Sequence, residues 1–282
     1  MHAILTADSG STKTHWVLSS EQGDILEIKT AGINPVRDSQ SVVLHVLHHE
    51  LLPQMPDSCH PQLIHFYGAG CIAPFSQTVC DALASLFPEA EIHVDTDLMG
   101  AARALCSNGP GIVCILGTGA NCGLYDGQRI IESVPPLGFI LGDEGSGAVL
   151  GRTLLGNVFK GLLDQSVIEA FRSETGLSQA DVIQHVYRES QPNVFLASMV
   201  PFITRHMDNR GVEEMVVEAF RQFARRNVVR FKALHSDVNF VGSIAHVFRP
   251  QLSEALNREG MRLGCVIQDP AMQMAVYHRE NA

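Results

Sequence analysis

The sequence predicts an α/β protein built from two strand-rich blocks that also carry helices, and three observations support this. The chain has 282 residues, of which 45% are hydrophobic and 18% charged, enough for the core of one large or two modest domains. Its opening third alternates apolar strand-like runs with runs of helical periodicity. A later stretch, GPGIVCILGTGANCGLYDGQRIIES, repeats the opening plan, in which an apolar strand enters a Gly/Thr turn and a second strand leaves it.

The first block is predicted to begin with three strands in antiparallel order. HAILTAD and HWVLSS flank the first turn, and EQGD makes a second turn before ILEIKTAG. In SQSVVLHVLHHELLPQ, four apolar residues are spaced like the buried face of a helix: Val43, Val46, Leu47 and Leu51. The predicted elements that follow are the strand QLIHFYGAG, the helix FSQTVCDALASLF, the strand EIHVD and the helix DLMGAARALC.

The second block is followed by a mostly helical region over residues 144–235, in which EEMVVEAFRQFARRNVVRFKAL is the clearest long helix. VNFVGS is predicted as a buried strand and HVFRPQLSEALNRE as the helix after it. DPAMQMAVYHREN is predicted as a last helix, with Asp269 placed to cap it and Pro270 at its first position. The turn residues CSNGP, 106–110, mark the best candidate for a domain boundary.

Bulk properties exclude several classes of protein. A formal net charge of -10 argues against broad nucleic-acid binding, which needs a basic surface. The seven cysteines are an odd number without a CxxC pair, so we expect a reducing, cytoplasmic setting and no disulfide framework. No leader pattern and no apolar run of bilayer-spanning length is present, so we expect no membrane partner.

The first turn carries Asp8, Gly10, Ser11, Thr12 and Lys13. A tight strand-turn-strand directs several backbone N–H groups to one side, and a glycine lets the backbone approach a ligand closely. Asp8 would repel phosphate unless a cation lies between them, which suggests Mg²⁺ held through water. The alternative is a polar hairpin whose Asp and Ser satisfy their own backbone.

The second turn, LGTGANCG, offers the same groups again: Gly117 and Gly119 around Thr118, followed by Asn121. Taken alone it is equally a glycine-rich hairpin. Because two such turns occur, each within a similar strand block, we favour the interpretation that the two turns bind the two ends of one polyphosphate.

VDTDLMGAARA places Asp95 and Asp97 at a strand end just before a helix. A carboxylate there can simply cap the helix. Alternatively, it can accept the proton of an attacking hydroxyl, as phosphoryl transfer to an alcohol requires. Asp97 is favoured for the second role because it directly opens the helix.

Three further segments carry groups suited to a ligand. GFILGDEGSGAVLG puts Asp143 and Glu144 between glycines before a helix, either as favourable helix-start charges or as acceptors for sugar hydroxyls. Asn34 in TAGINP can likewise be part of an ordinary turn or contact a sugar. NFVGSIA, with Gly242 and Ser243, suits a nucleoside packed on backbone, or is a plain strand-helix turn.

These segments in this order resemble the acetate and sugar kinase/heat-shock chaperone/actin superfamily. Within it they are most similar to the BadF/BadG/BcrA/BcrD ATPase family, which includes the N-acetylglucosamine kinases. ADSGSTKTHW resembles the first phosphate loop, ILGTGANCGL the second, NFVGSIA the adenosine segment and DTDLMGAARA the segment of the catalytic aspartate, here Asp97. GFILGDEGSG resembles the sugar-contacting loop, here with Asp143, and TAGINP the turn of a sugar-binding asparagine, here Asn34.

The resemblance implies two ribonuclease-H-like domains of the actin-like ATPase fold with an active cleft between them. The expected domains are residues 1–106, with the C-terminal helix 269–282 packed back on them, and residues 107–268 with a helical insert. It also implies Mg·ATP as phosphoryl donor, an N-acetylated amino sugar as acceptor and a homodimer. Asn34, Asn121, Asp143 and Glu144 are then expected to hold the sugar.

Two other functions stay open. One is an ATPase that drives a partner enzyme, as the activators of CoA dehydratases do. Those activators hold an iron–sulfur cluster through paired cysteines, and here only Cys122 follows the second loop. The other is a nucleotide or sugar sensor without catalysis, although kinase-like repressors carry an added helix-turn-helix and this chain begins at its first strand.

Overall fold

Two five-stranded mixed sheets form the framework of the computed structural model, which describes residues 3–10, 12–20, 23, 25–56, 59–234 and 237–281. The first sheet has the order β3-β2-β1-β4-β5 and the second the order β10-β9-β6-β7-β8. The chain divides into two compact units. The first is Met1–Pro110, Asp126–Ile130 and Asp269–Ala282, and the second is Gly111–Tyr125 and Ile131–Gln268.

The two sheets share one topology. In the first, β1 (Ala3–Ser9) pairs antiparallel with β2 (Lys13–Ser20) and parallel with β4 (Leu63–Gly68), and β3 (Ile25–Ala31) and β5 (Glu91–Thr96) form the edges. In the second, β6 (Gly111–Leu116) pairs antiparallel with β7 (Ala120–Tyr125) and parallel with β9 (Asp237–Val241). β8 (Ile130–Val134) and β10 (Arg262–Ile267) are its edges. The predicted α/β class and the repeated plan are therefore confirmed.

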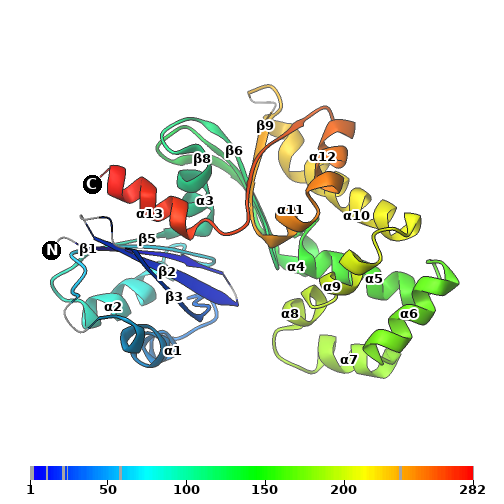
Figure 1. Cartoon of the computed structure of the whole chain (residues 1–282), viewed down its shortest axis with the longest axis horizontal. Coiled ribbons are helices and arrows are strands. Elements are labelled where there is room, and N and C mark those ends of the chain that lie inside the picture. Colours follow the sequence, from blue (N-terminus) through cyan, green and yellow to red (C-terminus); the bar gives the residue numbers. More distant parts are fainter. Residues whose placement is uncertain are drawn as a thin grey trace. The chain divides into compact units, whose positions relative to one another are not determined.

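Alternation along the strands gives the first sheet two different faces. Alternate strand residues such as Leu5, Trp16 and Phe66 pack into an apolar core against α1 (Gln40–Val46) and α2 (Ser76–Leu86). The opposite face is covered by α3 (Asp97–Cys106) and by the C-terminal helix α13 (Ala271–Glu280), which contacts β1, β2 and α3 (Figure 1). The C-terminal helix α13 therefore packs on the first sheet.

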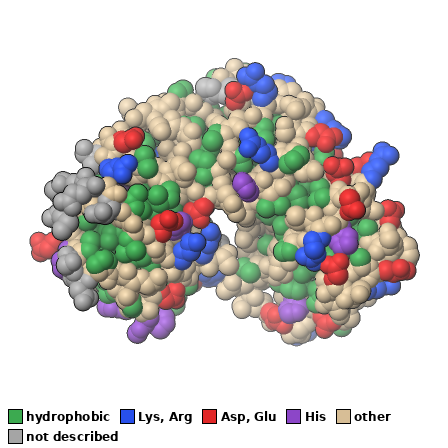
Figure 2. Space-filling view, viewed as in Figure 1, with side chains coloured by type: hydrophobic (Ala, Val, Ile, Leu, Met, Phe, Trp, Pro, Cys, Tyr) green, Lys and Arg blue, Asp and Glu red, His purple; other side chains and the backbone are tan. Residues whose placement is uncertain are grey.

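The second sheet is covered by helices that share one large core. The bounds of these helices are α5 (Gly147–Phe159), α10 (Arg210–Phe223), α11 (Ser243–Val247) and α12 (Arg249–Arg258). Four further helices lie within residues 160–210, where the helical insert was expected: α6 (Gln165–Thr175), α7 (Gln179–Tyr187), α8 (Pro192–Ala197) and α9 (Val200–Arg205). Among the described residues no helix combines the length and apolar character needed to span a bilayer. Figure 2 shows acidic and basic side chains interspersed over the face it displays.

Among the differences between prediction and structure are two interrupted helices and one additional strand. The long helix expected at 213–234 ends as α10 at Phe223 and continues as a π-helical turn, Ala224–Val228. The helix expected at 246–259 breaks at Phe248, because Pro250 fits the first turn of a new helix and not a helix interior. The strand β10 was not predicted.

Candidate functional site

The first turn is a tight hairpin at the exposed end of β1 and β2. The backbone N–H of Gly10 donates to the carbonyl of Lys13 at 3.0 Å, and Gly10, Thr12 and Lys13 are exposed. Below the turn, Ser9 Oγ and Thr14 Oγ1 lie 2.7 Å apart, and Ser9 Oγ accepts the N–H of Ile33 at 3.0 Å. The hydroxyl groups of Ser9 and Thr14 therefore fix the base of the turn. Ser11 lies outside the described residues.

Two carboxylates of the first unit lie close enough to influence each other. Asp8 is near the end of β1, and Asp97 is the first residue of α3, where the preceding Thr96 caps the helix by accepting the N–H of Met99. Burial, together with the negative charges of Asp269 and Asp97, raises the pKa of Asp8 to about 7. Thr96 serves as the cap, and Asp97 Oδ1 accepts the N–H of Leu98 at 2.8 Å in the first turn of the helix.

Asn34 is held in the turn after β3, next to the turn that follows β4. Its Oδ1 accepts the N–H of Val36 at 3.1 Å, and its own N–H donates to Asp38. Gly70, at φ 79°, packs against it so closely that a Cβ would meet Asn34 Oδ1 at 2.3 Å. Only glycine fits here, so the turn after β4 and the TAGINP turn are held together.

Asp269 has a role that sequence reasoning missed. Its carboxylate binds Lys13 Nζ and His15 Nδ1, each at 2.9 Å, and Pro270 takes the N-cap position of α13. The hydrogen bonds from His15 and Lys13 hold the pKa of Asp269 well below its usual range. The expected cap thus acts chiefly as a tertiary contact between the first turn and the C-terminal helix, and the Lys13 side chain is engaged there.

In the second unit, the second turn is fixed by the start of α5. Gly117 N–H donates to the Gly119 carbonyl at 3.0 Å, and the carbonyls of Gly117 and Thr118 accept the first two amides of the helix. Ser146 caps the helix by accepting the N–H of Val149. The helix start is therefore used to position the turn.

NFVGSIA, the segment predicted to pack against the nucleoside, lies next to this turn. Gly242 has φ 125°, and a Cβ there would meet the Leu116 carbonyl oxygen at 2.2 Å. Ser243, which begins α11, is exposed. The second phosphate-loop candidate and the predicted nucleoside segment are thus adjacent within one unit.

The predicted sugar loop reaches the same turn. Asp143 Oδ1 accepts the N–H of Ala120 at 3.3 Å, and Asp143 adopts a left-handed backbone, φ 55°. For a residue other than glycine this conformation is strained and persists only when its surroundings fix it. Burial raises the pKa of the Asp143 carboxyl. Asn121 lies next along β7, with its Oδ1 accepting the N–H of Cys122 at 2.9 Å.

Glu144 is fully engaged by two residues that sequence reasoning did not single out. Arg226 forms a charge-assisted hydrogen bond with Glu144 Oε1, and Asn227 Nδ2 donates to Oε2 at 3.3 Å. Both belong to the π-helical turn after α10, a type of irregularity that often marks functional sites. On the other side, Arg152 donates to the carbonyls of Phe139 and Ile140. The loop is held at both ends.

The structure therefore assembles the predicted residues in two sets. The first unit gathers Asp8, Gly10, Thr12, Lys13, Asn34 and Asp97. The second gathers the others: Gly117, Thr118, Gly119, Asn121, Asp143, Glu144, Gly242 and Ser243.

The solved structures similar to this chain include a relative of high identity. The chain is 42% identical to a candidate N-acetylglucosamine kinase from Porphyromonas gingivalis, over 100% of this chain and 99% of that chain, with a TM-score of 0.94. No family model and no curated protein matches the sequence.

Two more distant structures share the fold. A candidate N-acetylglucosamine kinase from Chromobacterium violaceum is 17% identical over 98% of this chain and 99% of that chain, with a TM-score of 0.74. A ROK family glucokinase from Streptomyces griseus, in complex with glucose and AMPPNP, is 14% identical over 99% of each chain, with a TM-score of 0.59.

Proposed function

The chain belongs to the family of N-acetylglucosamine-kinase-like carbohydrate kinases, and we propose that it phosphorylates an N-acetylated amino sugar with ATP. The acceptor is N-acetylglucosamine or its lactyl ether, N-acetylmuramic acid. The observation that carries the proposal is the 42% identity to a candidate N-acetylglucosamine kinase over the complete chain. The proposal also places the chain with the BadF/BadG/BcrA/BcrD-type ATPases.

In the proposed reaction, Asp97 accepts the proton of the sugar hydroxyl as its oxygen forms the new bond to the γ-phosphorus. The bond from that phosphorus to the oxygen of ADP breaks, and ADP leaves with the electron pair. Backbone amides around Gly10–Lys13 and around Gly117–Gly119 hold the phosphates, and Gly242 and Ser243 accommodate the nucleoside. Preorganised donors stabilise charge as it moves to the leaving oxygen, which is the main contribution of protein to phosphoryl transfer.

Mg²⁺ fits the chemistry of the first unit. Asp8 is a carboxylate whose raised pKa comes from burial and from two neighbouring negative charges, a situation that a divalent cation relieves. No group of three or more His, Cys, Asp or Glu in the described part of the chain is arranged to hold a metal. We therefore propose that Asp8 holds the ion through water, as is usual where substrate phosphates supply ligands. Bound Mg²⁺ would neutralise charge on the transferring group.

A pH dependence of the Mg²⁺ requirement is expected from Asp8. A carboxyl whose pKa is raised to about 7 is mostly protonated at pH 6 and mostly ionised at pH 8. Since a proton competes with the ion, the Mg²⁺ concentration for half-maximal activity should rise about tenfold between pH 8 and pH 6. Magnesium titrations at both values measure this, and a requirement that does not change with pH would contradict it.

For the acceptor, we propose that Asp143, Asn34 and Asn121 contact the sugar. Glu144 shares the loop, but both its oxygens are already engaged by Arg226 and Asn227. Glu144 then acts partly by fixing the strained backbone of Asp143, so Arg226 is a positioning residue for the sugar.

Arg226→Met is expected to raise the KM for the sugar at least fivefold, with a much smaller change in the KM for ATP. Removing the arginine leaves Glu144 with one weak partner, and the Asp143 backbone loses its support. Arg226→Lys keeps the charge and should restore part of the loss. Steady-state kinetics with each substrate varied separate the two constants.

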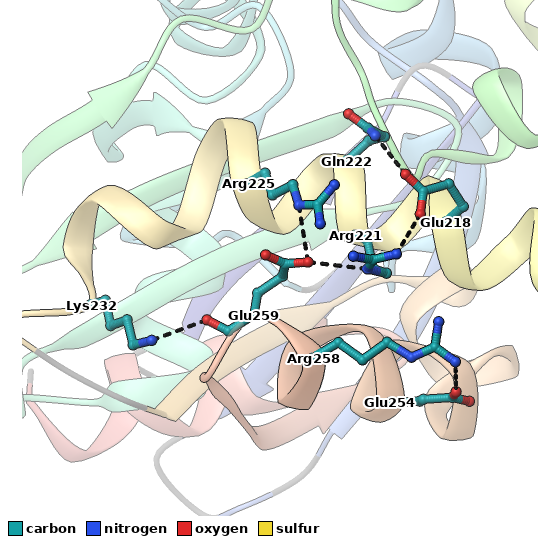
Figure 3. Close-up of polar contacts among 8 residues, drawn as sticks. All are labelled: Glu218, Arg221, Gln222, Arg225, Lys232, Glu254, Arg258 and Glu259. Atoms are coloured by element: carbon teal, nitrogen blue, oxygen red, sulfur yellow. Dashed lines mark hydrogen bonds and ion pairs between the residues drawn. The ribbon is translucent and has the colours of Figure 1, made fainter.

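Arg225→Met is the matched control. Arg225 precedes Arg226 in the same turn and is 44% exposed, but its Nε binds Glu259 Oε1 at 3.0 Å and not Glu144 (Figure 3). It should leave both constants near those of the parent protein. Equal effects of the two substitutions would show that helix stability, and not loop position, is responsible.

The proposed function is tested by a coupled ADP-release assay across hexoses, N-acetylhexosamines and N-acetylmuramic acid. Turnover should require an N-acetylated amino sugar. ATP hydrolysis at the same rate without any sugar would instead favour an ATPase that serves a partner enzyme. Binding of nucleotide or sugar without turnover would favour a sensor.

A further inference from the structure

A cavity of about 680 Å³ lies on the first unit, and none of the residues assigned above lines it. It is lined by residues of β4, β5, α2, α3 and α13. The parallel register of β4 and β5 pairs His65 with His93 and Tyr67 with Asp95, and all four line the cavity. Alternate residues such as Phe66 point to the apolar core on the other side of the sheet.

Three histidines are stacked at this cavity. The ring of His65 lies 5.0 Å from that of His93 and 3.4 Å from that of His278, with interplanar angles of 13° and 10°. Tyr67 Oη lies 2.8 Å from His278 Nε2. Burial, together with the neighbouring histidines and the positive charge of Arg103, lowers the pKa of His65 to about 3 and that of His278 to about 2. The two buried imidazoles are therefore neutral.

Arg103 is the cation of the cavity, and it has no anionic partner among the described residues. Its guanidinium carbon lies 5.3 Å from the centre of the Tyr67 ring and 5.5 Å from that of Tyr277. Arg103 Nε and His65 Nδ1 are buried without a hydrogen-bond partner. A buried polar atom left unpaired is costly, so both atoms indicate a missing acceptor or bridging group.

The other charged side chains that line the cavity are Glu91 and Asp95. Glu91 pairs with His93 at 2.9 Å. The positive charge of Arg103 would attract a single anionic group placed next to it. An extended polyanion would also lie next to Glu91 and Asp95, and their negative charges would repel it. Carboxylates also accept hydrogen bonds from hydroxyl groups.

We propose that this cavity is a second ligand site, for a small phosphorylated polyol whose phosphate binds Arg103 and whose hydroxyls face Glu91 and Asp95. Arginine suits a phosphate because its planar fork of donors matches the oxygens. The cavity volume suffices for a sugar monophosphate. None of the residues proposed to hold ATP, Mg²⁺ or the amino sugar lines this cavity, so the inference does not depend on the proposed function.

The test uses the full chain saturated with a non-hydrolysable ATP analogue, so that the nucleotide site is filled. Glycerol 3-phosphate is titrated while the imidazole proton resonances of His65 and His278 are followed by NMR. Saturable shifts of both histidines are expected, with glycerol giving none and inorganic phosphate binding more weakly. No saturable shift would overturn the proposal, and equal affinity for inorganic phosphate would overturn the polyol part.

Arg103→Met should weaken the binding of glycerol 3-phosphate at least tenfold, and Arg103→Lys should weaken it less. Arg279→Met is the control, since Arg279 is an exposed residue next to His278 on α13 and does not line the cavity. It should bind as the parent protein does. Unchanged affinity in Arg103→Met, with a circular dichroism spectrum like that of the parent, would overturn the assignment.

Discussion

Asp97→Asn is expected to abolish sugar phosphorylation while nucleotide binding persists. The amide has the size of the carboxylate but cannot accept the hydroxyl proton, and a positioned general base contributes roughly 10²- to 10⁴-fold to rate. The fold should tolerate the change because Thr96, and not Asp97, caps α3. The loss should fall on kcat, measured by ADP release, while calorimetry shows ATP affinity within a few fold of the parent value.

Asp81→Asn is the matched control for this prediction. Asp81 lies on the same unit, in α2, where it is exposed and accepts a hydrogen bond from Gln77 at 2.7 Å. Its replacement should leave kcat unchanged. Near-normal turnover in Asp97→Asn would remove Asp97 from the role of base and leave its position at the start of α3 without a catalytic explanation.

Gly151→Ala is expected to destabilise the second unit severely. A Cβ at this position of α5 would lie 1.8 Å from the Leu196 carbonyl oxygen at the end of α8, so the two helix backbones must separate. Forcing a methyl group into such a contact costs about 3 kcal/mol or more of unfolding free energy. Because α5 also fixes the second turn, ATP binding should weaken as well. Urea unfolding followed by circular dichroism measures the first effect.

Substitution of Gly156, in the same helix, is expected to have the opposite effect on stability. Gly156 has no atom within 4 Å of its would-be Cβ, so alanine meets nothing there. Alanine is favoured over glycine inside a helix, and Gly156→Ala should therefore raise the free energy of unfolding by about 0.5 to 1 kcal/mol. A similar loss from both substitutions would mean that helix α5 does not approach α8 as closely as described.

Periodicity was sufficient for most elements of the fold and failed where a local irregularity interrupts it. The strand RLGCVI was missed because its pairing with β9 shifts register between Leu263 and Val266, which removes the alternation that marks a strand. Around Asn227 the helix widens into a π-helical turn, and the side chains there follow a different spacing. Neither departure has a signature in the order of apolar residues.

Candidate site residues divide in the same way. The first turn, the second turn and the start of α3 were singled out because glycines and acids follow strand ends, and these segments do follow β1, β6 and β5. The sugar loop was singled out because two acids lie between glycines before a helix, and it does precede α5. The sequence did not suggest the roles proposed for Arg226 and Arg103, because a charged residue in a helix usually faces solvent and only its tertiary contacts show otherwise. The roles of Asp97 and the sugar-binding residues remain predictions.

By itself, the sequence determined the repeated strand plan, the glycine-bearing turns and the carboxylates at strand ends, because each depends on the conformational limits and polarity of adjacent residues. Only the tertiary structure decided which distant groups meet. Asp269 looks like a helix cap along the chain, yet folding brings its carboxylate to Lys13 and His15, more than 250 residues earlier. Such contacts follow from how α13 packs on the first sheet, and that packing depends on the summed burial of many side chains and not on any local pattern.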